Sequence, residues 1–135
     1  MRMQNSTKKV IAALIIKDEK VLIACRTKDD INKGKWEFPG GKQDEGELDE
    51  QTLARELYEE FGIKADIGSY VCSSFFEYKS ISYEMRAYKV YRFIGTLSLT
   101  EHSEIRWVSK NELPLYDMPD PDKPIVQELL LLDSW

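Results

Sequence analysis

Two continuous apolar runs, separated by four polar residues, restrict the fold of this chain more than any other feature. Val10–Ile16 and Val21–Cys25 flank the polar stretch Lys17–Lys20. Short apolar runs rich in β-branched residues, joined by a polar turn, predict a hairpin of buried strands. Such a hairpin indicates a sheet that is covered on both faces.

The rest of the chain predicts a mixed order of strands and helices. Leucines and a phenylalanine recur every four residues before Gly62, which is typical of an amphipathic helix with a glycine stop. Strands outnumber helices, so we expect an α+β fold with a sheet sandwiched between helices, rather than a doubly wound one. The expected strands are Trp36–Phe38, several within Ile63–Ile94, and Ile105–Val108; the expected helices are Leu48–Phe61 and Asp122–Leu132, with a capped turn at Ser109–Glu112.

Length and charge exclude several classes of protein. The 135 residues suit one domain, residues 1–135, and 24 acidic against 19 basic side chains give a net charge of −5. A duplex-DNA binder usually has a basic surface, so we expect no nucleic-acid partner. No apolar run reaches the roughly 18–20 residues of a membrane span, so we expect no membrane association.

Cysteine and histidine are too scarce to build several kinds of site. Cys25 and Cys72 stand far apart, which argues against a zinc knuckle or a disulfide framework and favours the reducing cytoplasm. His102 is the single histidine, and it lies in a polar stretch, so a histidine-based nucleophilic mechanism is disfavoured. Any chemistry is therefore expected to come from carboxylates.

Carboxylates gather on one edge of the helix expected before Gly62. At helical spacing, Glu56 and Glu60 border the apolar stripe, and Glu59 completes an acidic edge. Like charges three or four residues apart destabilise a helix, and a shared cation would remove that cost. Such hard oxygen ligands suit Mg²⁺ or Mn²⁺. The alternative is a solvated acidic face. The neighbouring Arg55 and the preceding Gly-Gly turn argue against this alternative.

The segment from Gly41 to Ile63 resembles the Nudix box, G-x5-E-x7-R-E-U-x-E-E-x-G-U with U aliphatic. Every fixed position of the pattern is filled, and the flanking stretches WEFPGGK, TEHSEIRWVS and DKPIV are similar to the MutT-like branch. The resemblance implies an α/β/α sandwich with a mixed sheet. The matching residues are Gly41, Glu47, Arg55, Glu56, Leu57, Glu59, Glu60, Gly62 and Ile63.

The resemblance also implies roles at the acidic edge. Glu56, Glu59 and Glu60 would hold the metal and supply the base, with the Gly40 carbonyl completing the metal shell. Arg55 would orient the carboxylates, with Glu47 as its structural partner. MutT-like members take a further glutamate from a later loop. Glu101 fits that place best, and Glu104 is the alternative.

A second set of residues resembles the nucleotide pocket of the same branch. Arg26 would contact phosphate or base, and its alternative is a solvated side chain at a strand end. Phe38 would form a pocket wall, and its alternative is packing in the core. Tyr78 and Tyr83 could stack on a base, although tyrosines are common on sheet faces. Asp122 would read the base edge, or else cap the last helix.

The type of side chain at position 122 bears on the expected substrate. The resemblance places an amide there in the 8-oxo-guanine sanitising enzyme, whereas a carboxylate is closer to the cytidine triphosphate type. A carboxylate accepts a hydrogen bond from an exocyclic amine such as cytosine N4. The carboxylate at this position argues against 8-oxo-dGTP as the substrate, but it does not identify the base.

The expected function is hydrolysis of a nucleoside triphosphate to the monophosphate and pyrophosphate, dependent on Mg²⁺ or Mn²⁺. One alternative is hydrolysis of a nucleotide sugar or a dinucleoside polyphosphate, and another is a catalytically idle nucleotide sensor. The intact set of three glutamates speaks against the sensor. The sequence leaves open the base, the sugar, any modified base, and whether the chain is a monomer or a homodimer.

Overall fold

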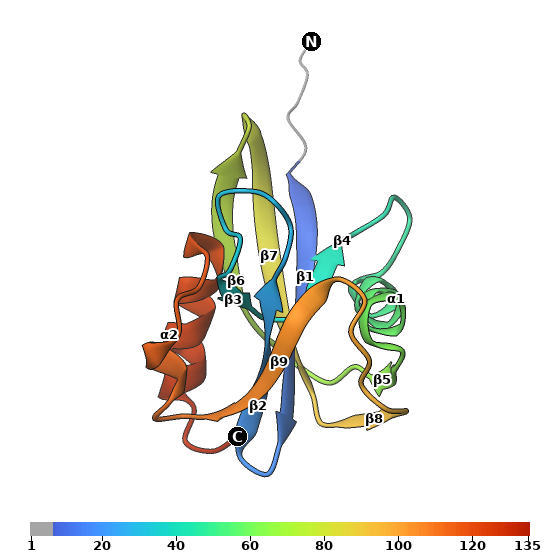
Figure 1. Cartoon of the computed structure of the whole chain (residues 1–135). Helices are drawn as coiled ribbons and strands as arrows, with labels where there is room; N and C mark the ends of the chain where they lie inside the picture. Colours follow the sequence, from blue (N-terminus) through green and yellow to red (C-terminus); the bar gives the residue numbers. More distant parts are fainter. Residues whose placement is uncertain (1–6) are drawn as a thin grey trace.

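The two apolar runs form the central hairpin of a mixed sheet, as the sequence predicted. The computed structural model describes residues 7–135, and Figure 1 shows the sheet with one helix on each side. The elements are β1 (Lys8–Lys17), β2 (Lys20–Arg26), β3 (Trp36–Glu37), β4 (Gly40–Lys42), α1 (Asp49–Phe61), β5 (Lys64–Asp66), β6 (Tyr70–Tyr78), β7 (Ile81–Val90), β8 (Arg92–Ile94), β9 (His102–Ser109) and α2 (Lys123–Leu131), with short 3₁₀ turns at Leu113–Leu115 and Asp120–Asp122.

The main sheet has the order β3-β2-β1-β7-β6, and it is mixed because β1 runs parallel to β7. The other pairings are antiparallel: β4 pairs with the first half of β1, and β9 pairs with β2. A separate two-stranded ribbon joins β5 and β8 beside the end of α1. The expected α+β sandwich with a mixed sheet is therefore confirmed.

Alternate residues of β1 enter two different cores, which explains its continuous apolar run. Ile11, Ala13 and Ile15 pack under α1, where Leu53, Leu57 and Phe61 are fully buried. Ala12, Leu14 and Ile16 pack on the other face with the apolar side of α2. Because successive strand residues point to opposite faces, only a strand covered on both sides needs every position apolar.

Local signals at the ends of α1 position its acidic edge. The helix ends at Gly62, whose φ of 72° is the left-handed conformation that glycine adopts without strain, and its N–H donates to the Tyr58 carbonyl. The expected capping box near the C-terminus is also present: the Ser109 N–H donates to Glu112, and the Glu112 N–H donates to the Ser109 hydroxyl.

The Asp122 side chain does not cap the last helix, although the residue lies at the expected position. Asp122 occupies the N-cap position of α2, but its side chain makes no capping hydrogen bond. Its carboxylate points to another element of the fold, described below. Within residues 7–135, no helix is both long enough and apolar enough to cross a membrane.

Candidate active site

Two adjacent glycines bring the β4 backbone against the acidic edge of α1. Gly40 has φ 148°, and a Cβ at this position would lie 2.0 Å from the Ile11 carbonyl oxygen. A Cβ at Gly41 would lie within 2.3–2.6 Å of the Glu56 carboxylate. The backbone leaves room only for glycine at Gly40, whereas a Cβ at Gly41 would push the Glu56 carboxylate aside, so the Gly-Gly turn and Glu56 form one packed unit.

Arg55 is the centre of the ion pairs that organise this unit. Its guanidinium donates to Glu47 over 2.8 Å and 3.0 Å, to Glu56 over 3.1 Å and to Glu59 over 3.2 Å. It also donates to the Lys42 carbonyl, which ties α1 to the end of β4. The hydrogen bonds from Arg55 lower the pKa of Glu47 to about 2. Arg55 and Glu47 therefore form the expected pair, which fixes the loop before α1.

The three glutamates of the acidic edge differ in burial. Glu59 is exposed, Glu56 is half-buried, and Glu60 is only 6% exposed. Burial raises the pKa of Glu60 to about 9, and the nearby carboxylates of Glu56, Glu101 and Glu37 raise it further. Burial also raises the pKa of Glu56, against the pull of Arg55. Burial is thus the main cause of the raised pKa values here, and repulsion from neighbouring carboxylates adds to it at Glu60.

Glu101, rather than Glu104, is the later glutamate that approaches this cluster. The Thr100 hydroxyl donates to the Glu60 carbonyl over 2.9 Å, and the Thr27 hydroxyl donates to the Glu101 carbonyl over 2.7 Å. The first bond holds the loop before β9 against the end of α1, and the second holds it against the residue that follows β2. Glu104 instead pairs with Arg106 at 2.8 Å, and its side chain is half exposed.

The carboxylates of the acidic edge are the type of donor that a divalent cation prefers, but their present arrangement does not form a complete site. Glu60 Oε1 is enclosed and has no hydrogen-bond partner in the described chain, which is costly for a polar atom unless a cation binds it. As the side chains lie, no three histidine, cysteine or acidic residues of positions 7–135 are grouped closely enough to ligate one ion. Glu56 and Glu59 are turned toward Arg55. A shared ion would therefore require these two carboxylates to rotate.

A partly buried network of polar side chains lies next to the glutamates, and the sequence did not point to its central residue, Glu37. Glu37 accepts from Arg26 over 2.9 Å and lies 2.9 Å from His102 Nε2. Arg26 also donates to Asp30, so it is held between two carboxylates and is not a solvated strand end. The His102 ring stacks on Phe61. The stretch Trp36-Glu37-Phe38 predicted a strand, but the alternation of apolar and polar residues could not show that Glu37 contacts Arg26 and His102.

Asp122 is 3% exposed, and its carboxylate accepts a hydrogen bond from the Phe38 backbone N–H over 3.1 Å. Burial raises the pKa of Asp122 to about 7; the Phe38 hydrogen bond opposes this rise. Phe38 itself lies in the core on the α2 side, so its ring packs as a core residue. The contact links α2 to the strand that leads into the Gly-Gly turn.

The two tyrosines considered for base stacking lie in different surroundings. Tyr83 is buried and stacks on Phe76, with ring centroids 5.0 Å apart and planes at 8°. The Lys42 ammonium lies 5.8 Å from the Tyr83 ring centroid, so this pair adjoins β4. Tyr78 is exposed beside the β6–β7 turn, under the Lys79 ammonium. Phe76 was missed because the sequence does not show which face of β6 lies beside Tyr83.

A mixed sheet between two helices, with a Gly-Gly turn packed on an acidic helix edge, defines a hydrolase of the Nudix type. The NUDIX domain family model matches residues 7–129. The chain therefore belongs to the Nudix family, as its sequence resemblance predicted.

Relatives within the family are named as nucleotide hydrolases. The chain is 38% identical over 123 residues to the CTP pyrophosphohydrolase of Escherichia coli, covering 91% of each chain. It is 33% identical to the putative 8-oxo-dGTP diphosphatase 2 of Mycobacterium tuberculosis, covering 89% of this chain and 86% of the relative. Both names describe hydrolysis of a nucleotide, so the chain is a Nudix hydrolase.

Solved structures agree with this assignment. The solution structure of the E. coli ORF135 protein matches with a TM-score of 0.87 at 36% identity, covering 93% of this chain and 90% of that one. A MutT structure described for Aliivibrio salmonicida and Vibrio cholerae matches with a TM-score of 0.74 at 30% identity, covering 93% and 98%.

Proposed function

We propose that this chain hydrolyses a nucleoside triphosphate to the monophosphate and pyrophosphate, and that the reaction requires Mg²⁺ or Mn²⁺. The observation that carries this proposal is the buried Glu60 carboxylate, crowded by Glu37, Glu56 and Glu101 and left with an unpartnered oxygen. A triphosphate is strongly anionic and is repelled by these acids unless a cation lies between them. The relatives named for CTP and 8-oxo-dGTP support the same reaction class.

The proposed metal ligands are the Gly40 carbonyl and the carboxylates of Glu56, Glu59, Glu60 and Glu101. When bound, a divalent ion activates water and stabilises negative charge on the attacking and leaving oxygens. The acidic edge belongs to a rigid helix, and the Gly-Gly turn is fixed by its packing on Ile11 and Glu56. This rigidity suits phosphoryl transfer, which depends mainly on positioning and electrostatics.

The chain's own groups have distinct proposed tasks. Arg55 pairs with Glu56 and Glu59 and limits the orientations that their carboxylates can take. One glutamate of the acidic edge takes the proton of the attacking water, a task typically worth 10²–10⁴-fold in rate. Arg26, fixed beside the cluster by Glu37 and Asp30, supplies positive charge toward the substrate phosphates.

Asp122 and the Phe38 backbone are proposed to select the base. Only one Asp122 oxygen accepts from Phe38, so the second is available to accept from an exocyclic amine such as cytosine N4. The stacked Tyr83 and Phe76 rings, next to Lys42, are the proposed aromatic wall for the base. We therefore propose a preference for cytosine nucleotides, in line with the E. coli relative named for CTP.

Hydrolysis of 8-oxo-dGTP is the second candidate, favoured by a specific feature of Asp122. Its pKa of about 7 allows a protonated form near neutrality. A protonated carboxyl can donate as well as accept, as an amide does. This form would suit the oxidised guanine named in several relatives.

A nucleotide panel tests the proposal. CTP, dCTP, UTP, dTTP, dGTP and 8-oxo-dGTP are incubated with Mg²⁺, and the monophosphate and pyrophosphate are measured. We expect cytosine nucleotides to exceed uracil and thymine nucleotides by about tenfold to a hundredfold in kcat/KM, because a carbonyl facing Asp122 leaves that group unpaired. Equal rates for cytosine and uracil would contradict the base assignment. Release of the diphosphate and inorganic phosphate would contradict the reaction itself.

A further inference from the structure

The segment between β8 and β9 is tied to the end of α1 by hydroxyl groups. The Thr100 hydroxyl donates to the Glu60 carbonyl over 2.9 Å and lies 3.3 Å from the Glu59 carbonyl oxygen. Ser98 donates to the Phe61 carbonyl twice, from its backbone N–H over 2.9 Å and from its hydroxyl over 3.2 Å. Figure 1 shows this segment running past α1 to reach β9.

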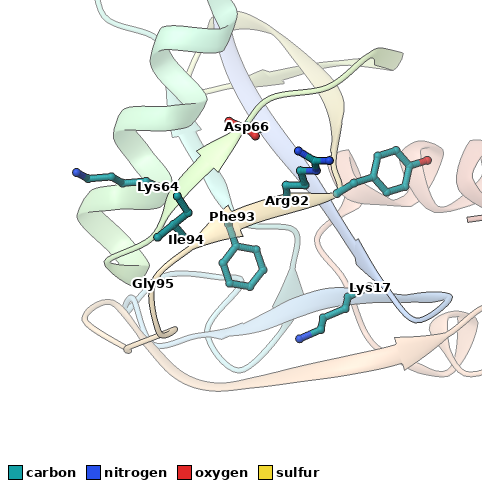
Figure 2. Close-up of a pocket in the computed structure, with 8 residues that line it drawn as sticks. Lys17, Lys64, Asp66, Arg92, Phe93, Ile94 and Gly95 are labelled. Atoms are coloured by element: carbon teal, nitrogen blue, oxygen red, sulfur yellow. The ribbon is translucent and has the colours of Figure 1, made fainter.

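These bonds satisfy carbonyls that the helix itself leaves open. The last carbonyls of a helix have no partner within it, and after the Tyr58 carbonyl, which accepts from Gly62, the donors to α1 come from this segment. The segment also begins in close contact with the helix, since a Cβ at Gly95 would lie 3.0 Å from the Gly62 carbonyl oxygen. Figure 2 shows Gly95 at the end of β8, beside the last turn of α1. The end of the helix therefore fixes the course of the chain toward β9.

Glu101 follows directly, and contacts on both sides fix its backbone. The preceding residue, Thr100, is bonded to α1, and the Glu101 carbonyl accepts from the Thr27 hydroxyl over 2.7 Å. The following residue, His102, is buried and stacks on Phe61, with ring centroids 5.4 Å apart. These contacts come from α1 and from the loop after β2, so they determine where the Glu101 side chain leaves the backbone.

Charge opposes this placement of Glu101. Its carboxylate is close enough to Glu60 to raise the pKa of that buried acid. The C-terminal end of a helix carries partial negative charge, which also disfavours an acid beside it. Both effects push Glu101 away from α1 when no cation is bound. The hydroxyl bonds of Thr27 and Thr100 act against this repulsion.

We propose that Thr27 and Thr100 are positioning residues for Glu101. Their hydroxyls hold its backbone beside the acidic edge, so that its carboxylate takes part in binding a divalent cation. This inference rests on the proposed function, because it gives Glu101 a place among the metal ligands. Neither threonine is assigned a contact with the cation or the nucleotide. The alternative is that Thr100 only caps α1, in which case the residue at position 101 is irrelevant to its effect.

Mn²⁺ binding to the nucleotide-free, full-length chain tests the proposal without turnover, with free Mn²⁺ followed by electron paramagnetic resonance. Both threonines are exposed, so their variants should stay folded. Thr100→Val and Thr27→Val should each raise the Kd for Mn²⁺ about threefold to tenfold, as expected for the loss of one hydrogen bond. Thr100→Ser restores the hydroxyl and should bind Mn²⁺ as the parent chain does. Thr96→Val is the matched control, since Thr96 is an exposed threonine of the same segment and its hydroxyl makes no hydrogen bond within residues 7–135.

A double-mutant cycle with Glu101→Gln separates positioning from capping. If Thr100 acts through Glu101, Thr100→Val should weaken Mn²⁺ binding in the parent chain and have no further effect once Glu101→Gln is present. The positioning role is overturned if Thr100→Val weakens binding by the same factor in both backgrounds, because the hydroxyl then acts on α1 alone. It is also overturned if Thr100→Val binds Mn²⁺ as tightly as the parent chain.

The same measurements distinguish this inference from the proposed function. A parent chain that binds Mn²⁺ and hydrolyses CTP, with the Kd unchanged in Thr27→Val and Thr100→Val, overturns the positioning role and leaves the proposed function standing. A parent chain that binds no Mn²⁺ overturns the proposed function, and the positioning role with it.

Discussion

At the scale of single residues, Glu60 is an acid whose negative charge is disfavoured both by burial and by neighbouring carboxylates. We expect Glu60→Gln to lower kcat by at least ~10²-fold, because the amide keeps the shape and removes the charge that would hold a metal ion. The fold should persist, with a Tm no lower than that of the parent. Glu50→Gln makes the same change at an exposed site of α1 and should leave kcat unaltered. Normal turnover in Glu60→Gln would mean that the acidic edge is only a charged surface.

Asp122 should decide which base is preferred. Asp122→Asn keeps an oxygen for the Phe38 N–H and presents an amide to the base. We expect the cytosine preference to shrink and oxidised guanine to gain, measured as ratios of kcat/KM within one panel. An unchanged ranking of nucleotides would reduce Asp122 to a structural link between α2 and the strand before the Gly-Gly turn.

The same substitution should change how stability depends on pH. The pKa of Asp122 is about 7 in the fold because of burial, above its ordinary value of 3.8. Between these values the folded chain holds a proton that the unfolded chain releases, so the free energy of unfolding falls as pH rises. Asn does not titrate. Asp122→Asn should therefore gain stability relative to the parent from pH 4 to pH 7, by a few kcal/mol at most, and then level off. A constant difference in denaturant unfolding across that range would show that Asp122 is not held protonated.

At the scale of elements, the site depends on β4 packing against α1. Gly41→Ala puts a Cβ within 2.3–2.6 Å of the Glu56 carboxylate and must displace it. Gly46 lies in open space but has φ 86°, so alanine there is strained without touching the site. We expect Gly41→Ala to lower kcat with little change in Tm, and Gly46→Ala to lower Tm with little change in kcat. The reverse pattern in kinetics and thermal unfolding would separate the Gly-Gly turn from catalysis.

The elements themselves were largely predictable, because each carries a local signal. The apolar runs of β1 and β2, the four-residue recurrence in α1 and the stop at Gly62 all report local periodicity. Asp122 does occupy the N-cap position, but a local pattern could not predict that its carboxylate bonds to Phe38, which is 84 residues away in the sequence, instead of capping the helix. Glu37 and Phe76 were missed for the same reason, since their partners come from other strands.

At the scale of the whole molecule, the active site is an acidic region that the fold assembles from distant segments. Its acids come from β3, α1 and the loop before β9. The net charge of −5 does not show this clustering. The Nudix pattern located the acidic region because its spacing is fixed along the chain. Glu37 lies outside that pattern, and only the fold brings it to the cluster.

The central claim is that a divalent cation makes the acidic site competent to hydrolyse a nucleoside triphosphate, and chelation tests it most directly. CTP is incubated with the parent chain in excess EDTA, then with Mg²⁺ or Mn²⁺ restored, while CMP and pyrophosphate are quantified and the Tm is followed. We predict no product in EDTA, an unchanged fold, and full recovery of CMP and pyrophosphate when the metal returns. Undiminished release of CMP in EDTA would contradict the account.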